Sequence, residues 1–397
     1  MNINLINHIQ RVSELLYKNK NTIFLFVFLA IVLAVVTPFN NGDTPPMLLA
    51  KELLTGKPYL PEKFSWIEML EWEDHYYIAY PPMVTFIVLP YILLGGQYLG
   101  GAAINSLMIF GAAIFLFLLV KKLRGIQQWA SLAAIAYVIG TTNLHSAHIG
   151  SVWLLMHSQG NFFLLLSLWL FCCRRAYFWS GLSFAIAFQV RYVILAAFIV
   201  FPLYAFSYFR PMPTIRQWRN FLLGVLPPCL MAWAFQWWTL GNPFTSPYTV
   251  AWNQWGPPEY IFSLNYLQRN FQIYFWGMPS LLPQFPYVRF EFDGQAMWVI
   301  SPFLLGVLFL NFQRRFIWAF LPSAIVMLSA YLCYFHTGYT QYGTRYVQDI
   351  FPLLIPLAFT GFSYSKLWIR ELLPIAVVIS CLINIYAVFF TLNINWS

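Results

Sequence analysis

The feature that most constrains this chain is a series of long apolar runs with almost no charge inside them. A hydrocarbon core about 30 Å thick needs roughly 20 apolar residues in a helix. Nine runs approach that length: 22–38, 101–120, 152–173, 192–209, 220–240, 296–312, 316–334, 347–363 and 372–391. Two shorter runs, 128–142 and 176–190, complete the series. Hydrophobic residues make up 60% of the chain, more than a soluble domain can bury. The sequence therefore predicts an all-α polytopic membrane protein, a single domain over 1–397 with about eleven transmembrane helices.

A further apolar run, 82–94, decides the predicted topology. It is short for a span and follows Tyr80-Pro81-Pro82. If it lies flat on the outer surface, the basic clusters between the other runs all fall inside, with 15 of the 22 Lys and Arg residues. Because cytoplasmic loops are enriched in Lys and Arg, we expect an interfacial helix here and a cytoplasmic N-terminus. The predicted location is the plasma (inner) membrane. Short basic clusters also argue against a nucleic-acid partner.

The same topology separates the acidic residues, although they were not used to derive it. It places 11 of the 13 Asp and Glu residues outside. Most lie in two long extracytoplasmic loops, 39–100 and 241–295. We expect the active face of an enzyme there, although outer loops also carry charge simply because they are solvated.

The first outer loop holds the leading catalytic candidate. Asp43 lies just past the end of the first span and precedes a predicted amphipathic helix over 46–55. It can act as a general base, or it can cap that helix. Further along, Asp74, His75 and Tyr80 mix carboxylate, imidazole and aromatic groups that suit a sugar or acceptor site. An interfacial aromatic belt with solvated acids explains them equally well.

Three histidines lie around the second outer segment, 143–151. His145 and His148 are one helical turn apart, and His157 follows at the start of the next span. Three imidazoles could bind a metal, but no carboxylate or cysteine lies nearby. We therefore expect no metal or other cofactor, and we assign these side chains to sugar or phosphate binding, or to a structural role.

Arginines near the outer surface are candidates for holding a phosphate. Arg191 is flanked by apolar residues at the end of a span, where a charge needs an anionic partner. Arg345 precedes another span and can bind a phosphate bidentately at headgroup depth, or it can anchor the helix at the interface. Arg269 and Arg289, in the loop 241–295, are reserve candidates. Tyr248 in the same loop is a candidate for sugar or acceptor contact.

Together these motifs resemble the GT-C superfamily of glycosyltransferases that use polyprenyl-phosphate sugars, the group of protein O-mannosyltransferases and lipid A aminoarabinose transferases. The residues that carry the resemblance are Gly42-Asp43, Leu53-Leu54-Thr55-Gly56, Tyr80-Pro81-Pro82 to Gly95, Trp153 with His157, Gly181-Leu182 to Arg191, Gly241-Asn242-Pro243 with Pro247-Tyr248, and Gly343-Thr344-Arg345-Tyr346 to Pro352-Leu353. They span residues 20–360 in the order that such proteins show.

The resemblance implies a GT-C fold and an inverting transfer on the extracytoplasmic side, with Asp43 as the general base. Members with diphosphate donors carry an acid pair in the second outer loop for a divalent metal. This chain has histidines there, so the resemblance implies a polyprenyl-monophosphate donor and no metal. Thr44 follows Asp43, where most protein O-mannosyltransferases have an acid. The expected partners are the lipid-linked sugar, a glycan, lipid or protein acceptor, and the bilayer.

Two other functional classes stay open at this point. A transporter or flippase of lipid-linked sugars also needs arginines and aromatic residues, but it should place polar groups along a path at mid-membrane depth. The predicted spans are almost free of charge there. A non-catalytic scaffold is the third possibility, in which the outer acids are incidental.

Overall fold

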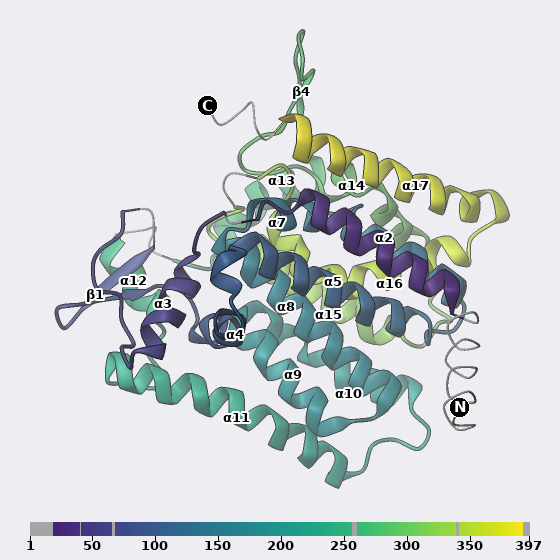
Figure 1. The fold of residues 1–397 in the computed structure, drawn as a ribbon. Coiled ribbons are helices and arrows are strands. Elements are labelled where there is room, and N and C mark those ends of the chain that lie inside the picture. The colour runs from purple at the N-terminus through teal and green to yellow at the C-terminus, as the bar shows by residue number, and fades with distance from the viewer. Residues whose placement is uncertain (1–18, 40, 66–67, 256–259, 339–340, 392–397) are drawn as a thin grey trace, which may run out of the picture.

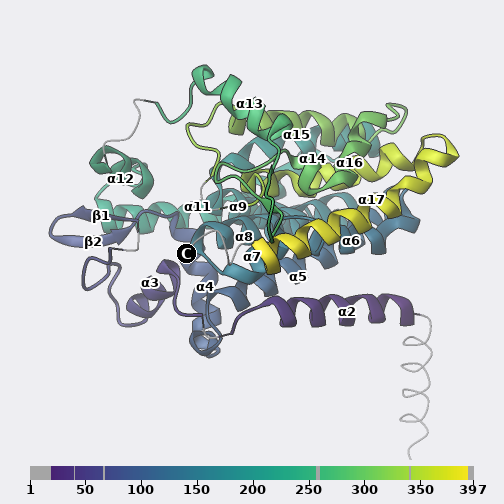
Figure 2. The same ribbon diagram turned by 90° about the horizontal axis from the view of Figure 1, so that it is seen from above.

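The protein is a helical bundle with small appendages at one end (Figure 1). The computed structural model describes residues 19–39, 41–65, 68–255, 260–338 and 341–391. Four long helices, α2 (Lys20–Val36), α5 (Gly101–Val120), α11 (Ile215–Leu240) and α17 (Leu367–Tyr386), all run roughly along one direction (Figures 1 and 2).

The remaining elements connect and fill this bundle. In chain order they are α3 (Pro45–Leu54), β1 (Met69–Trp72), β2 (His75–Ile78), α4 (Pro82–Leu93), η1 (Gly96–Tyr98), η2 (Gln127–Trp129), α6 (Ala130–Val138), α7 (Asn143–Ile149), α8 (Val152–Trp169), η3 (Leu170–Arg174), α9 (Tyr177–Val190), η4 (Tyr192–Ile199), α10 (Val200–Tyr208), α12 (Pro247–Trp255), η5 (Leu264–Tyr266), α13 (Leu267–Trp276), β3 (Ser280–Leu281), β4 (Val288–Arg289), α14 (Met297–Ile300), η6 (Pro302–Phe309), α15 (Ile317–Leu332), η7 (Arg345–Ile350), α16 (Phe351–Ser363) and η8 (Ala387–Thr391).

The expected all-α membrane architecture is confirmed, whereas the number of eleven spans stays a prediction. Four described helices are long and apolar enough to cross a membrane: Gly101–Val120, Val152–Arg174, Ile215–Leu240 and Leu367–Phe390. Five shorter apolar helices accompany them. The run 296–312 is not one continuous α-helix, because it changes to a 3₁₀ helix at Ser301-Pro302, where proline cannot donate a helical hydrogen bond. The run 128–142 likewise holds a shorter helix, α6.

Helix α4, the run that decided the predicted topology, lies across the bundle. Figure 1 shows it end-on, while the long helices run across the page. It packs against α3, α9 and α11. This is the orientation that a helix on a membrane surface would have, although its position relative to a bilayer stays a prediction. The helix expected over 46–55 is present as α3.

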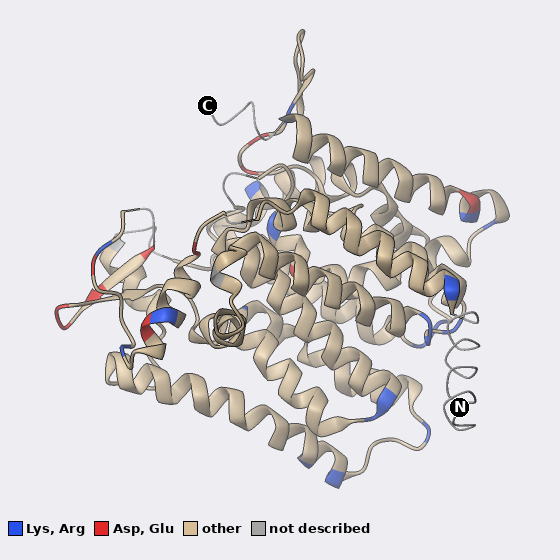
Figure 3. Cartoon of the chain, viewed as in Figure 1, with Lys and Arg blue, Asp and Glu red and all other residues tan. Residues whose placement is uncertain are grey.

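Charged residues separate along the bundle axis (Figure 3). Most acidic residues lie at the end that carries β1, β2 and α3, and many basic residues lie at the opposite end. Glu371, at the start of α17, is an exception. Among the described residues, the acidic and basic side chains are therefore separated in space as expected from the sequence. The bundle has an acidic end and a basic end.

Glycines allow the tightest helix packing. A Cβ on Gly181 of α9 would lie 2.0 Å from the carbonyl oxygen of Phe221, and one on Gly224 of α11 would lie 2.0 Å from that of Phe178. Neither position can hold a larger residue unless the two helices move apart. Small residues at helix contacts are typical of membrane bundles, where close backbone approach provides much of the packing energy.

Candidate active site

Three side chains from separate segments meet around one buried carboxylate, supplied by a fourth segment, at the acidic end of the bundle. Asp349 is fully buried. Its Oδ1 lies 2.6 Å from His157 Nδ1, and its Oδ2 accepts a 3.0 Å hydrogen bond from Arg191 Nε. The hydroxyl of Tyr331 donates to the same Oδ2, and Arg191 donates to that hydroxyl through a second nitrogen, at 3.2 Å. Both carboxylate oxygens are thus satisfied, as a buried charge requires.

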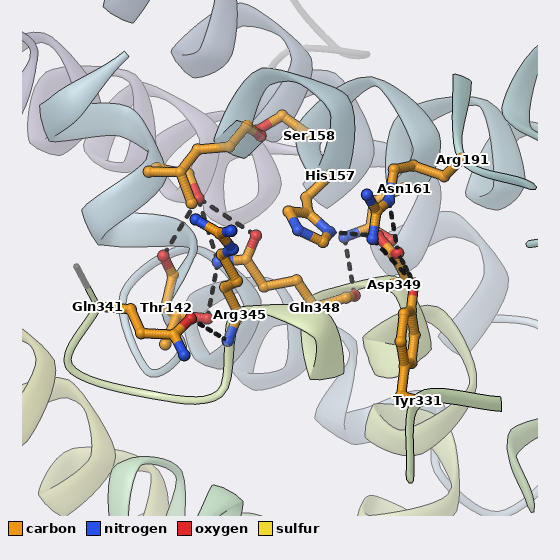
Figure 4. A network of polar contacts seen from close by, with 12 residues as sticks. Thr142, His157, Ser158, Asn161, Arg191, Tyr331, Gln341, Arg345, Gln348 and Asp349 are labelled. Carbon is orange, nitrogen blue, oxygen red and sulfur yellow. Dashed lines mark hydrogen bonds and ion pairs between the residues drawn. The ribbon is translucent and has the colours of Figure 1, made fainter. Parts of the chain in front are cut away.

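Local backbone structure brings these groups together. Helix α9 ends at Val190, and the backbone of Arg191 is extended before η4 begins, so the helix is interrupted at the charged residue. His157 comes from α8, Asp349 from η7 and Tyr331 from α15. Figure 4 shows the side chains of His157, Arg191 and Tyr331 converging on the carboxylate of Asp349. An ionised group in an apolar run needs such partners, and they are supplied by residues distant in sequence.

Arg345 occupies the neighbouring position, on the other side of His157 (Figure 4). Its guanidinium lies 5.5 Å from the ring centre of Trp153 and 5.4 Å from that of Tyr346, both within cation–π range. The indole nitrogen of Trp153 donates to the carboxylate of Glu68 at 3.2 Å. Arg345 is therefore held above two aromatic rings, one of which is tied to an acid of the first loop.

Buried amides fix the backbone around Arg345. The side chain of Gln348 donates to the hydroxyls of Thr142 and Ser146, at 2.8 and 3.1 Å. Asn161 donates to the carbonyl of Gln348 at 2.9 Å, and the backbone N–H of Arg345 donates to the side chain of Gln341 at 3.1 Å. These bonds join η7 to α7 and α8, so the position of Arg345 is set by a connected network.

The titratable groups around Arg345 respond to burial and to its charge. Burial, with smaller contributions from His148 and then Arg345, lowers the pKa of His145 to about 3, so this imidazole is neutral at physiological pH. Burial and then Arg345 also lower the pKa of His336. Burial first and then the carboxylate of Glu68 raise the pKa of Tyr80 well above its usual value, and Arg345 opposes them. Groups from three connecting segments thus surround one guanidinium.

Asp43 lies where the first outer loop meets the bundle. Gly42 adopts a left-handed backbone (φ +88°), and its carbonyl accepts the N–H of Gly101 at 3.3 Å. Thr44, not Asp43, is at the N-cap position of α3, and its side chain makes no capping hydrogen bond. The Asp43 side chain is 25% exposed, and its Oδ2 accepts a 2.6 Å hydrogen bond from Lys51 in the last turn of α3. Its carboxylate is therefore partly exposed to solvent.

The three histidines do not gather around a common point. His145 packs edge-on against the ring of Tyr342, with 5.2 Å between ring centres, and His148 Nδ1 lies 2.9 Å from the carbonyl oxygen of Val36. His157 faces Asp349. In the part of the chain that the structure describes, no three His, Cys, Asp or Glu side chains lie close enough to hold a metal ion. Metal independence stays a prediction.

The structure places three other predicted residues away from this centre. Asp74 lies in the turn of the β1–β2 hairpin, with φ +60°, and the ring of His75 is tilted against that of Tyr59, with 4.0 Å between ring centres. Arg289 lies on β4 with a half-exposed side chain, 3.9 Å from Glu291. These positions have local explanations, and their functional assignment stays a prediction.

Two further candidates lie beside the centre. Arg269 donates to the carbonyl oxygen of Phe335 at 2.5 Å, next to His336. The hydroxyls of Tyr248 and Tyr334 are 3.1 Å apart, and the Tyr334 ring packs edge-on against Tyr346. Tyr248 is thereby connected to the aromatic cluster that carries Arg345.

Sequence reasoning did not include Tyr331, Glu68 or Asp349 among the candidate site residues. One signal could have identified Asp349, since it is the lone carboxylate inside an apolar run. Opposite charges isolated in two apolar runs, such as Asp349 and Arg191, are natural partners. Tyr331 and Glu68 carry no comparable signal, because tyrosines and glutamates are common in the segments that contain them.

Comparison with known proteins extends this description. No protein-family model matches the chain, and no curated protein matches its sequence. Among solved structures, the fold is similar to that of ArnT from Cupriavidus metallidurans bound to undecaprenyl phosphate, with a TM-score of 0.54 and 14% identity. That match covers 91% of this chain and 64% of ArnT.

A second similar structure is the archaeal oligosaccharyltransferase AglB from Archaeoglobus fulgidus, in complex with an inhibitory peptide and a dolichol-phosphate. Its TM-score is 0.53 at 12% identity, over 94% of this chain and 56% of AglB. The chain therefore spans less than two thirds of the length of either protein. Both have the GT-C fold, and the GT-C architecture expected from the sequence is confirmed.

Proposed function

We propose that this chain, which has the GT-C fold, is an integral membrane glycosyltransferase. It moves a sugar from a polyprenyl-monophosphate carrier to an acceptor hydroxyl on the extracytoplasmic side, with inversion. The observation that carries the proposal is Arg345, which lies on a platform of aromatic rings beside buried polar groups at the acidic end of the bundle. The lipid phosphates in the structures of ArnT and AglB support the choice of donor class.

Asp43 is the proposed general base. The proton of the acceptor hydroxyl passes to a carboxylate oxygen, and the acceptor oxygen forms a bond to the anomeric carbon. The bond from that carbon to the phosphate oxygen breaks, and its electron pair leaves with the polyprenyl phosphate. Asp43 is accessible, and its contact with Lys51 orients the carboxylate. No general acid is required, because a phosphate leaves as an anion.

Arg345 is the proposed phosphate ligand. The phosphate gains negative charge as its bond to the sugar breaks, so a fixed guanidinium stabilises the transition state more than the ground state. Arg191 is held by Asp349 and Tyr331, and we therefore assign it a positioning role in addition to any contact with the phosphate. Tyr80 and Tyr248 border the same region and are the proposed contacts to the sugar or acceptor. The chemistry proposed here uses no divalent metal.

The test is sugar transfer by the purified chain in lipid vesicles, with a panel of polyprenyl-phosphate sugars as donors. Asp43→Asn should lower turnover about a hundredfold to ten-thousandfold, the usual contribution of a positioned base. Donor binding, measured by native mass spectrometry, should be unchanged in this variant and lost in Arg345→Gln. Glu62→Gln is the matched control, since Glu62 is an exposed carboxylate of the same loop.

Two results would refute the proposal. Near-normal turnover by Asp43→Asn would remove its role as the base. Movement of a lipid-linked sugar across the vesicle membrane without transfer to any acceptor, unaffected by Asp43→Asn, would identify a flippase.

A further inference from the structure

A cavity of about 430 Å³ opens at the basic end of the bundle, far from the candidate active site. It is lined by Arg124, Tyr208, Gln313, Arg314, Arg315 and Phe316. Helix α5 has 20 residues, so it separates the Gly42–Gly101 contact from this cavity by about 30 Å. The cavity is therefore a separate feature that the proposed transfer does not use.

Two connecting segments, almost 200 residues apart in sequence, form the cavity. Arg124 lies in the turn after α5, and Arg314 lies in the turn between η6 and α15. Tyr364 ties them together. Its hydroxyl donates to the carbonyl of Arg124 at 3.3 Å, and the guanidinium of Arg314 lies 3.7 Å from its ring centre. A Cβ on Gly125 would lie 1.3 Å from that hydroxyl, so this close approach requires glycine.

The described residues do not neutralise the charge of the cavity. Among the described residues, no carboxylate lies within ion-pair distance of Arg124, Arg314 or Arg315. The Nε of Arg314 is buried and has no hydrogen-bond partner in the described part of the chain. A buried donor without a partner costs free energy, and guanidinium groups close together repel one another. An anion with several oxygens would satisfy both needs, and a phosphate matches the guanidinium geometry.

The surroundings point to a membrane lipid as the source of that phosphate. The cavity lies where α10 ends and α15 begins, and these two helices pack against each other. Beside it, the rings of Phe312 and Trp318 are 5.6 Å apart and about half exposed. Exposed aromatic rings next to basic groups at helix ends are typical of the headgroup region of a bilayer.

We propose that this cavity, the Arg124–Arg315 pocket, binds the phosphate of an anionic glycerophospholipid. The lipid headgroup lies against the three guanidinium groups, and its acyl chains extend along the apolar surfaces of the adjoining helices. Binding joins the turn after α5 to the turn before α15. The proposal is independent of the transferase activity and needs no substrate.

Native mass spectrometry of the full chain tests the pocket directly, with phosphatidylglycerol compared against phosphatidylcholine of the same acyl chains. The wild type should prefer phosphatidylglycerol. The double variant Arg124→Gln/Arg315→Gln should lose about 30-fold in its affinity, about 2 kcal/mol at about 1 kcal/mol for each arginine. The matched control Arg216→Gln/Arg219→Gln removes the same charge from the exposed start of α11 and should bind as the wild type does.

Each other outcome contradicts the proposal. Equal losses in the two double variants would show a general attraction to the basic end, without a pocket. Displacement of phosphatidylglycerol by inorganic phosphate at similar concentrations would assign the site to a soluble anion. If the Gln variant fails to fold, Arg124→Lys/Arg315→Lys keeps the charge but loses the bidentate geometry. Unchanged preference for phosphatidylglycerol in that variant would overturn recognition by guanidinium groups.

Discussion

Replacing Asp349 by Asn tests whether the buried charge cluster holds the bundle together. The carboxylate is fully buried and is the ion-pair partner of Arg191, whose side chain is only 16% exposed. Asn keeps the size of the side chain but removes the charge, so Arg191 is left without its counter-charge in a region that excludes water. Losing one partner of a buried pair costs about 3–5 kcal/mol. Because Arg191 retains some exposure, we expect about 3 kcal/mol, the lower end of that range.

The measurement is the free energy of unfolding, obtained by steric trapping in bicelles at neutral pH. Asp43→Asn serves as the matched control, because it makes the same chemical change in a partly exposed pair with Lys51. Exposed pairs contribute about 0–1 kcal/mol, so this control should be nearly as stable as the wild type. Asp43→Asn should therefore lose sugar transfer while keeping its stability, whereas Asp349→Asn should lose stability.

A second substitution identifies the cause of the loss. Arg191→Gln/Asp349→Asn removes both charges, and replacing a whole buried pair costs much less than breaking it. The double variant should recover about 2 kcal/mol relative to additive losses, a coupling expected of residues in direct contact. Wild-type stability of Asp349→Asn, or strictly additive losses in the double variant, would refute the view that this ion pair stabilises the bundle.

Further predictions concern single positions. Gly150→Ala should lower the free energy of unfolding more than Gly241→Ala does, measured by the same assay. Both glycines have a left-handed backbone, which costs an alanine about 1–2 kcal/mol of strain. Only at position 150 would the added Cβ also lie 2.4 Å from a backbone nitrogen. The pKa of His145 is about 3 in the folded chain, against an ordinary value near 6.5 in the unfolded chain. Between these two pH values the unfolded state binds more protons, so the free energy of unfolding falls as the pH is lowered. His145→Gln should reduce that dependence by up to about 1.4 kcal/mol for each pH unit, seen in unfolding measured from pH 7 to 5. Tyr331→Phe should cost about 1–3 kcal/mol, because Asp349 loses a buried donor, and equal stability would contradict the bond.

The sequence by itself determined the class of protein and the separation of its charge. Apolar runs of spanning length require a membrane environment, and short basic clusters between them indicate which ends share a side. The helix α3 and the loop position of Asp43 also followed from local signals, because proline, glycine and capping residues act over a few positions. The separate positions of Arg191 and Arg345 as charged residues beside apolar runs were visible for the same reason.

Only the tertiary structure decided which of these groups meet. His157 and Asp349 are 192 residues apart, and Arg191 and Asp349 are 158 apart, yet they form one ion-paired cluster. The spans are apolar around most of their circumference, so hydrophobic periodicity does not indicate which helix face points inward. The sequence did not indicate the Arg124–Arg315 pocket either. Its basic residues are typical of ordinary positive-inside clusters, and only the fold brings the two distant turns together around Tyr364.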